Sequence, residues 1–199
     1  MATLGQWHDL APGPDLDRQI AIILSILFEH SVILDDKVSP DLAKQISDPS
    51  FLDHPKSYHD LIDLAASHIQ KLEVQDRTAF IAGHPRIGEV SNLSAMSAAE
   101  QASRKTSPEV LHQLEQLNAA YEQAYPGLRY ITFVNGRTRA EIVPELEGVL
   151  GFTGGIENYK PERIVVRQVG SREWEAELDR AVHDVILIAK ARLVALGLN

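Results

Sequence analysis

The sequence predicts an all-α protein, a compact multi-helix single domain that spans residues 1–199. Apolar residues recur every three to four positions in several separate segments, which is the spacing of one face of an α-helix. Only two short stretches are typical of strands, and no internal repeat, low-complexity tract or linker divides the chain. With 44% hydrophobic and 24% charged residues, a chain of this length buries enough surface to fold without disulfides.

The first half of the chain is expected to be helical after an irregular lead-in over residues 1–14, where prolines and glycines gather. Asp15 caps a helix that runs to about Glu29, and Pro40 suits the first position of a short helix to about Ile46. An apolar stripe predicts a further helix over residues 57–72. Residues 82–93 are predicted to be irregular because glycines and a proline interrupt them.

The second half is expected to contain longer helices. Ser107 and Pro108 are typical of a helix start, and this helix stops before Pro126. A helix over residues 138–150 is bent or divided by Pro144, and the last helix runs over residues 171–196. The strand-like stretches at 130–134 and 163–167 are predicted to pair as one small β-hairpin packed on the helices.

Composition and charge exclude several classes of function. A net charge of −9 and a pI near 5.3 argue against nucleic acid, because phosphate binding needs clustered basic side chains. The apolar run Ile20 to Phe28 is too short to span a bilayer, so no membrane association is expected. Without cysteine there are no thiolate nucleophiles, and the histidines lack the spacing of a metal site. We expect a cytoplasmic protein; a peroxisomal location is the alternative, although Gly197-Leu198-Asn199 is no peroxisomal address.

His84 is the first candidate for chemistry. Pro85 pushes the preceding residue out of the helical region, so the histidine is held in an extended conformation at a loop. The unperturbed pKa of histidine lies near neutral pH, and a positioned histidine can therefore donate or accept a proton. The competing interpretation is a turn histidine that hydrogen-bonds to the backbone.

Ser97, Glu100 and Gln101 form the second candidate group, with two interpretations. Ser97-x-x-Glu100 matches a capping box, in which both side chains satisfy backbone donors at a helix start. If Ser94 caps the helix one turn earlier, Ser97, Glu100 and Gln101 instead share one exposed face that suits a polar heterocycle. The sequence alone does not choose between the two registers.

Arg192 is the third candidate, since it lies on the apolar stripe of the last helix. An arginine at such a place must extend to the surface, pair with an acid, or bind an anion. A cation near a helix C-terminus is also favoured by the helix dipole.

Four motifs in order along the chain resemble those of the 2-oxo-4-hydroxy-4-carboxy-5-ureidoimidazoline (OHCU) decarboxylase family. They are His84-Pro85, Ser97-x-x-Glu100-Gln101, Leu117-Asn118-x-x-Tyr121 and Arg192-Leu193. The resemblance covers residues 16–196.

The resemblance implies an all-helical homodimeric enzyme of purine catabolism that decarboxylates a small-molecule ureidoimidazoline to S-allantoin. It implies no cofactor and no metal. By matching position, the proposed catalytic pair is His84 and Glu100. The implied substrate contacts are Pro85, Ser97, Gln101, Tyr130, Ile131 and Arg192, with Tyr130 and Ile131 in a loop whose backbone meets the substrate ring.

The chain departs from the family pattern in three places. Many members have D-L-A-G after His-Pro, where this chain has Arg86-Ile87-Gly88. Loop 125–131 has an extra residue and no proline at Arg129. Residues 148–164 are predicted to be an insertion. Two other hypotheses stay open, the first of them favoured by the altered residues 125–131. One is a related enzyme that acts on another ureido compound, and the other is a non-catalytic helical interaction module on the same scaffold.

Overall fold

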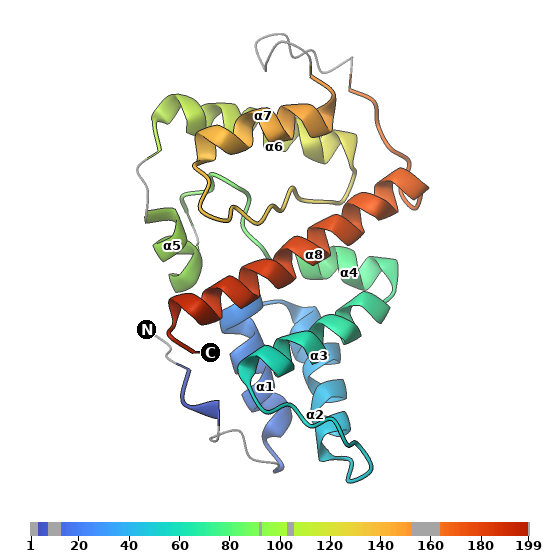
Figure 1. The fold of residues 1–199 in the computed structure, drawn as a ribbon. Helices are drawn as coiled ribbons and strands as arrows, with labels where there is room; N and C mark the ends of the chain where they lie inside the picture. Colours follow the sequence, from blue (N-terminus) through green and yellow to red (C-terminus); the bar gives the residue numbers. More distant parts are fainter. Residues whose placement is uncertain (1–3, 8–12, 92, 103–105, 153–163, 199) are drawn as a thin grey trace. The chain divides into compact units, whose positions relative to one another are not determined.

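The computed structural model describes residues 4–7, 13–91, 93–102, 106–152 and 164–198, without the side chains of residues 101 and 102. This part of the chain is helical, which confirms the predicted all-α fold (Figure 1). The elements are α1 (Leu16–Phe28), a π-helical segment η2 (Leu34–Val38), α2 (Ser39–Ser47), α3 (Tyr58–Lys71), α4 (Val74–Ile81), α5 (Ala95–Ala102), α6 (Pro108–Ala124), α7 (Arg139–Leu150) and α8 (Arg172–Ala195). None of the described helices combines the length and hydropathy needed to cross a bilayer.

The chain divides into two compact units by its internal contacts. Unit 1 comprises residues 1–84 and 182–199, and unit 2 comprises residues 85–181. The division falls between His84 and Pro85 and again within α8, so this helix contributes residues to both units. The predicted single domain stays a prediction.

Unit 1 has a core built from the apolar faces of its helices. Helices α1 and α2 pack against each other and against η2, and α3 contacts both η2 and α2. An ion pair of 2.6 Å between Lys190 and Asp63 joins the unit 1 part of α8 to α3. The predicted apolar stripes of the first and third helices are buried, at Leu16, Ile20, Leu24, Leu27, Leu61, Ile62, Ala65 and Ile69.

Unit 2 is organised around α6 and α7, which pack against each other. Trp174 at the start of α8 is buried, and its indole N–H donates to the carbonyl of Pro126 at 3.0 Å. This bond fixes the chain where it leaves α6 and enters loop 125–131. The buried side chains of α6 and α7 include Leu114, Leu117, Tyr121, Ile142 and Leu146.

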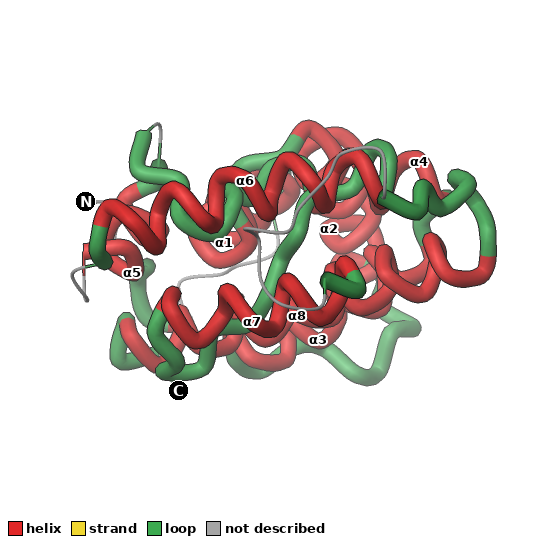
Figure 2. The backbone as a smooth tube through the Cα atoms, turned by 90° about the horizontal axis from the view of Figure 1, so that it is seen from above, coloured by secondary structure: helices red, strands yellow, loops and turns green. Residues whose placement is uncertain are grey.

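The predicted β-hairpin is wrong. Among the described residues, neither 130–134 nor 164–167 forms a strand, and Figure 2 shows only helices and loops. The carbonyls of Phe133 and Val134 accept from Arg137, and the amide of Arg167 donates to the carbonyl of Ala124 at the end of α6. Side chains and a helix end thus take the backbone groups that a partner strand would need. Residue 163 lies outside the described residues.

Most predicted helix limits are confirmed, including the side-chain cap of Ser107. Ser57 also caps α3 with its side chain. Asp15 occupies the N-cap position of α1 but makes no cap hydrogen bond. Pro144 does not divide α7, which is continuous from Arg139 to Leu150. Helix α4 lies in a stretch for which no helix was predicted, and η2 occupies the expected link before α2. Residues 153–163 of the predicted insertion 148–164 lie outside the described residues.

Candidate functional site

His84 is buried at the turn that follows α4. The amides of Gly83 and His84 donate to the carbonyls of Phe80 and Ile81 at 3.2 and 3.1 Å, so the helix closes in a tight turn directly before Pro85. The His84 side chain is 3% exposed. His84 is thus a buried histidine at a turn, and both interpretations that the sequence left for it, a proton-transfer group and a turn histidine that hydrogen-bonds to the backbone, remain open.

Gly83 explains how this turn is held in unit 1. A Cβ at this position would lie 2.8 Å from the carbonyl oxygen of His30, closer than real Cβ atoms come to backbone. Only glycine permits such an approach. The close packing places the turn before His84 against His30 and Ser31, the residues that directly follow Glu29.

Arg192 is paired with an acid. Its Nη2 lies 2.7 Å from Oε1 of Glu29, and its Nη1 donates to the carbonyl of Leu27 at 3.2 Å. The two charged side chains are 1% and 7% exposed. Of the three alternatives that the sequence left for Arg192, the structure shows the buried ion pair.

Glu29 is a functional candidate that the sequence analysis missed. It ends α1 with a φ of 69°, in the left-handed region that residues other than glycine rarely adopt. Strain of this kind costs about 1–3 kcal/mol and persists only where surrounding contacts require it. The sequence offered one indication, an acid at the end of a strongly apolar helix. Its pairing with a residue 163 positions later depends on the fold.

The structure settles the register of α5 in unit 2. The amide of Ser97 donates to Oγ of Ser94 at 3.1 Å, and the amide of Ala98 donates to the Ser94 carbonyl at 2.8 Å. Ser94 is therefore the N-cap, and the proposed capping box of Ser97 and Glu100 is wrong. Ser97 is buried at 2% exposure and Glu100 is exposed, so the expected shared exposed face is also incorrect. The side chain of Gln101 lies outside the described residues.

The loop that begins with Pro85 is anchored on one face of α6. The guanidinium of Arg86 contacts the carboxylate of Glu122 at 2.5 and 3.0 Å, and the amide group of Asn118 donates to the carbonyl of Ile87 at 2.9 Å. Gly88 has a φ of 84° and packs against Leu114. Because Leu114, Asn118 and Glu122 are spaced by four residues, they form one ridge of the helix. The hydrogen bonds that Arg86 donates to the Glu122 carboxylate raise the pKa of Arg86.

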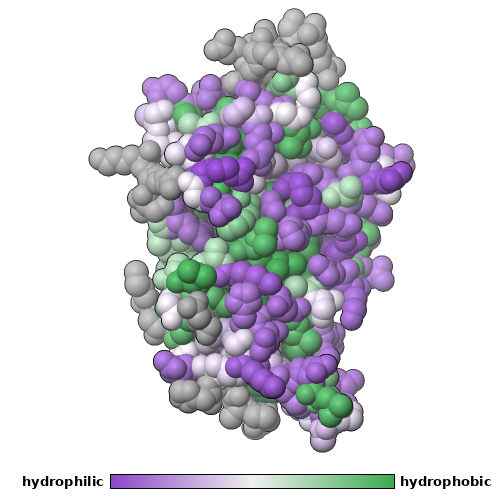
Figure 3. All heavy atoms as spheres, viewed as in Figure 1, coloured by the Kyte–Doolittle hydropathy of each residue, from purple (hydrophilic) through white to green (hydrophobic). Residues whose placement is uncertain are grey.

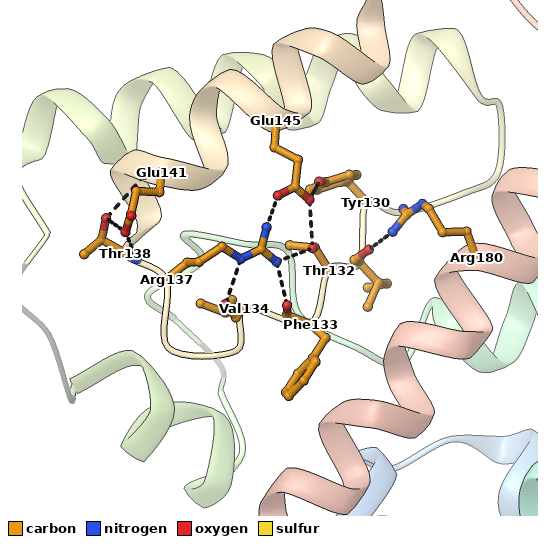
Figure 4. A network of polar contacts seen from close by, with 10 residues as sticks. Tyr130, Thr132, Phe133, Val134, Arg137, Thr138, Glu141, Glu145 and Arg180 are labelled. Atoms are coloured by element: carbon orange, nitrogen blue, oxygen red, sulfur yellow. Dashed lines mark hydrogen bonds and ion pairs between the residues drawn. The ribbon is translucent and has the colours of Figure 1, made fainter.

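Tyr130 and Ile131 are buried in unit 2, at 1% and 3% exposure. The hydroxyl of Tyr130 donates to Glu145 at 2.8 Å, and the carbonyl of Ile131 accepts from Arg180 at 2.8 Å (Figure 4). Burial and the Glu145 carboxylate raise the pKa of Tyr130, so its hydroxyl stays protonated. Arg137, Glu145 and Arg180 were not identified from the sequence.

The candidate residues therefore belong to two groups. His84 and Arg192 lie in unit 1, together with Glu29. Pro85, Ser97, Glu100, Gln101, Tyr130 and Ile131 lie in unit 2.

Comparison with known proteins identifies the family. The model of the OHCU decarboxylase family matches residues 17–154, which is more than half of the chain. The chain belongs to the OHCU decarboxylase family. The matched range includes His84, Pro85, Ser97, Glu100, Gln101, Tyr130 and Ile131. Arg192 lies beyond it.

A solved structure supports the fold. The crystal structure of (S)-allantoin synthase is similar to this chain with a TM-score of 0.58 and 20% sequence identity. The match covers 96% of this chain and 54% of the other, so the chain spans about half the length of that solved protein. Likeness at this identity concerns the fold alone. No curated protein matches the sequence.

Proposed function

We propose that this protein is a cofactor-independent OHCU decarboxylase that produces (S)-allantoin. The match of the family model to residues 17–154 carries the proposal, because this range contains both members of the expected catalytic pair, His84 and Glu100. Two observations support it. His84 is buried at the turn directly before Pro85, and the cap at Ser94 places Glu100 in the second turn of α5, where its residue is exposed.

The proposed reaction breaks the bond between the ring carbon and its carboxylate. CO2 leaves, and the electron pair remains on carbon, where the conjugated ring of the substrate accepts it. A proton then adds to that carbon to give allantoin. The protein has to orient the ring, bind its polar groups and transfer one proton. His84 and Glu100 are the proposed proton-transfer pair, and a fixed donor on one face of the ring accounts for a single enantiomer.

Arg192, Ser97 and Gln101 are proposed to bind polar groups of the substrate. Arginine suits this role because its planar guanidinium presents several N–H donors in a fixed geometry. The pair with Glu29 holds the guanidinium of Arg192 in one orientation before substrate binds. Such preorganisation lowers the entropy lost on binding.

Homodimerisation and a cytoplasmic location are further proposals. The first rests on the family resemblance and the second on the sequence.

The test is allantoin formation from freshly prepared substrate, obtained by enzymatic oxidation of urate and hydrolysis of the product. Circular dichroism follows the (S)-enantiomer, because uncatalysed protonation in water has no facial preference. The wild-type protein is expected to accelerate its formation without added metal. His84→Ala is expected to lower kcat by about 100-fold or more, the usual contribution of a positioned acid or base.

His59→Ala provides the matched control, because His59 is an exposed histidine on α3. This variant is expected to keep wild-type activity. Far-UV circular dichroism of each variant shows whether the helices are intact. A wild-type protein with no effect on the reaction, or a folded His84→Ala variant with full activity, would contradict the proposal.

A further inference from the structure

We propose that Arg180 is a positioning residue that fixes the backbone of loop 130–134 through its hydrogen bond to the Ile131 carbonyl. The consequence for substrate binding rests on the proposed function, in which Tyr130 and Ile131 meet the substrate. Neither the family motifs nor the sequence pattern assigns a role to Arg180.

Arg180 is held in one orientation by its neighbours in unit 2. Its Nε and Nη2 donate to the two carboxylate oxygens of Glu177 at 2.9 and 2.6 Å, and its Nη1 donates to the Ile131 carbonyl at 2.8 Å. The guanidinium carbon also lies 5.1 Å from the centre of the Tyr130 ring. One planar group thus contacts α8, the loop backbone and the loop side chain together.

Glu177 is in turn fixed by Tyr121. The Tyr121 hydroxyl donates to Oε1 of Glu177 at 2.6 Å, and both residues are buried. Burial and the nearby Glu177 carboxylate raise the pKa of Tyr121, which keeps this donor protonated. Burial alone would lower the pKa of Arg180. The hydrogen bonds to Glu177 and the charge of that carboxylate outweigh burial, so the pKa of Arg180 is raised. The two donors to Glu177, the Tyr121 hydroxyl and the Arg180 guanidinium, therefore both keep their protons.

A second arginine holds the other end of the same loop. Arg137 donates to the carbonyls of Phe133 and Val134 at 2.6 and 2.9 Å, and it pairs with Glu145. The Glu145 carboxylate also accepts from Tyr130 and Thr132. As Figure 4 shows, Arg137 and Arg180 approach the loop from opposite ends, with Glu145 on α7 above it.

This arrangement orients the peptide groups of the loop. The C=O of Ile131 and the N–H of Thr132 belong to one planar trans peptide, so they point in opposite directions. A bond that fixes the carbonyl toward Arg180 therefore directs the Thr132 N–H away from Arg180. That N–H has no acceptor among the described residues, although Thr132 is only 7% exposed. Buried backbone donors normally have partners, so a donor of this kind is suited to a ligand oxygen.

Arg180→Lys tests the proposal, because lysine keeps the charge but cannot donate to Glu177 and Ile131 in the same fixed fork. Arg167→Lys is the matched control. Arg167 belongs to the same unit and also lies over a tyrosine ring, at 4.9 Å from the centre of Tyr125, but its hydrogen bond goes to the exposed Val165 carbonyl. Two measurements are made on the purified full chain: amide hydrogen exchange over residues 128–137, and the steady-state kinetics of substrate turnover.

Arg180→Lys is expected to speed exchange over 128–137 and to raise KM by about tenfold, with a smaller change in kcat and an unchanged pH profile. The control is expected to change neither. Unchanged exchange and KM in Arg180→Lys would overturn the inference, and so would faster exchange without a change in KM. If Arg180→Lys does not fold, Tyr121→Phe removes one hydrogen bond to Glu177 and is expected to act in the same direction. Exchange needs no substrate, so an inactive wild-type protein would refute the proposed function alone.

Discussion

At the scale of single residues, the ion pair between Glu29 and Arg192 is a buried electrostatic contact of unit 1. Both side chains are almost completely buried, and their charged atoms lie 2.7 Å apart. Removing one partner leaves the other charge buried without compensation, which typically costs about 3–5 kcal/mol. Replacing both partners by apolar side chains of similar size is often nearly neutral.

This pair allows structural and functional roles of Arg192 to be separated. Glu29→Met and Arg192→Met are each expected to lower the free energy of unfolding by about 3–5 kcal/mol, and the double variant by much less. Urea denaturation of the four proteins measures the coupling. Additive losses in the double variant would show that the pair contributes little. If Arg192 binds substrate as proposed, the double variant folds but has a raised KM.

The sequence identified Arg192 as a candidate but did not identify its partner, Glu29. Arg192 stands out because a charge on an apolar helical stripe violates a local pattern. Glu29 ends its helix, where a charged side chain is ordinarily solvated, so its position gave only a weak indication. Its partner Arg192 lies on a distant segment of the chain, and no local pattern encodes a contact of this kind.

At the scale of secondary structure, the cap of α5 determines how Ser97 and Glu100 are presented. Ser94→Ala removes the acceptor for the Ser97 amide and is expected to lower the free energy of unfolding by about 1 kcal/mol. Ser94→Asp keeps a side-chain acceptor at the N-cap position and serves as the comparison in the same urea titration. A loss in Ser94→Asp as large as that in Ser94→Ala would contradict the assignment of Ser94 as N-cap. Ser94→Ala is also expected to lower activity, since a frayed first turn displaces Ser97.

Helices that begin at a capping residue and carry an apolar stripe were predictable from the sequence, and irregular segments were not. Ser57, Ser107 and the apolar stripes gave correct limits because they are local features. The capping-box pattern at Thr138 and Glu141 forms the box in the structure (Figure 4), whereas the same pattern at Ser97 and Glu100 does not. At α5 the earlier Ser94 competes for the cap. The strand-like composition of 130–134 was misleading because Arg137 and Arg180 replace a partner strand.

At the scale of the whole molecule, both hydrophilic and apolar residues are exposed. Figure 3 shows hydrophilic residues over much of the visible face, with apolar residues among them. The exposed large apolar residues of the described chain come from separate segments, including Ile22, Leu52, Val90, Val165 and Val194. Scattered residues of this kind are normal on a folded protein and do not by themselves identify an interface.

The predicted single domain can be tested because each unit contains one tryptophan. Trp7 packs edge-to-face against Tyr58 in unit 1, and Trp174 is buried in unit 2. Trp174→Phe leaves fluorescence from unit 1, and Trp7→Phe leaves fluorescence from unit 2. In each variant, urea unfolding followed by fluorescence is expected to coincide with unfolding followed by far-UV circular dichroism, since a single domain of this size unfolds in one cooperative transition. Fluorescence midpoints that differ from the dichroism midpoint of the same variant would show that the two units unfold independently.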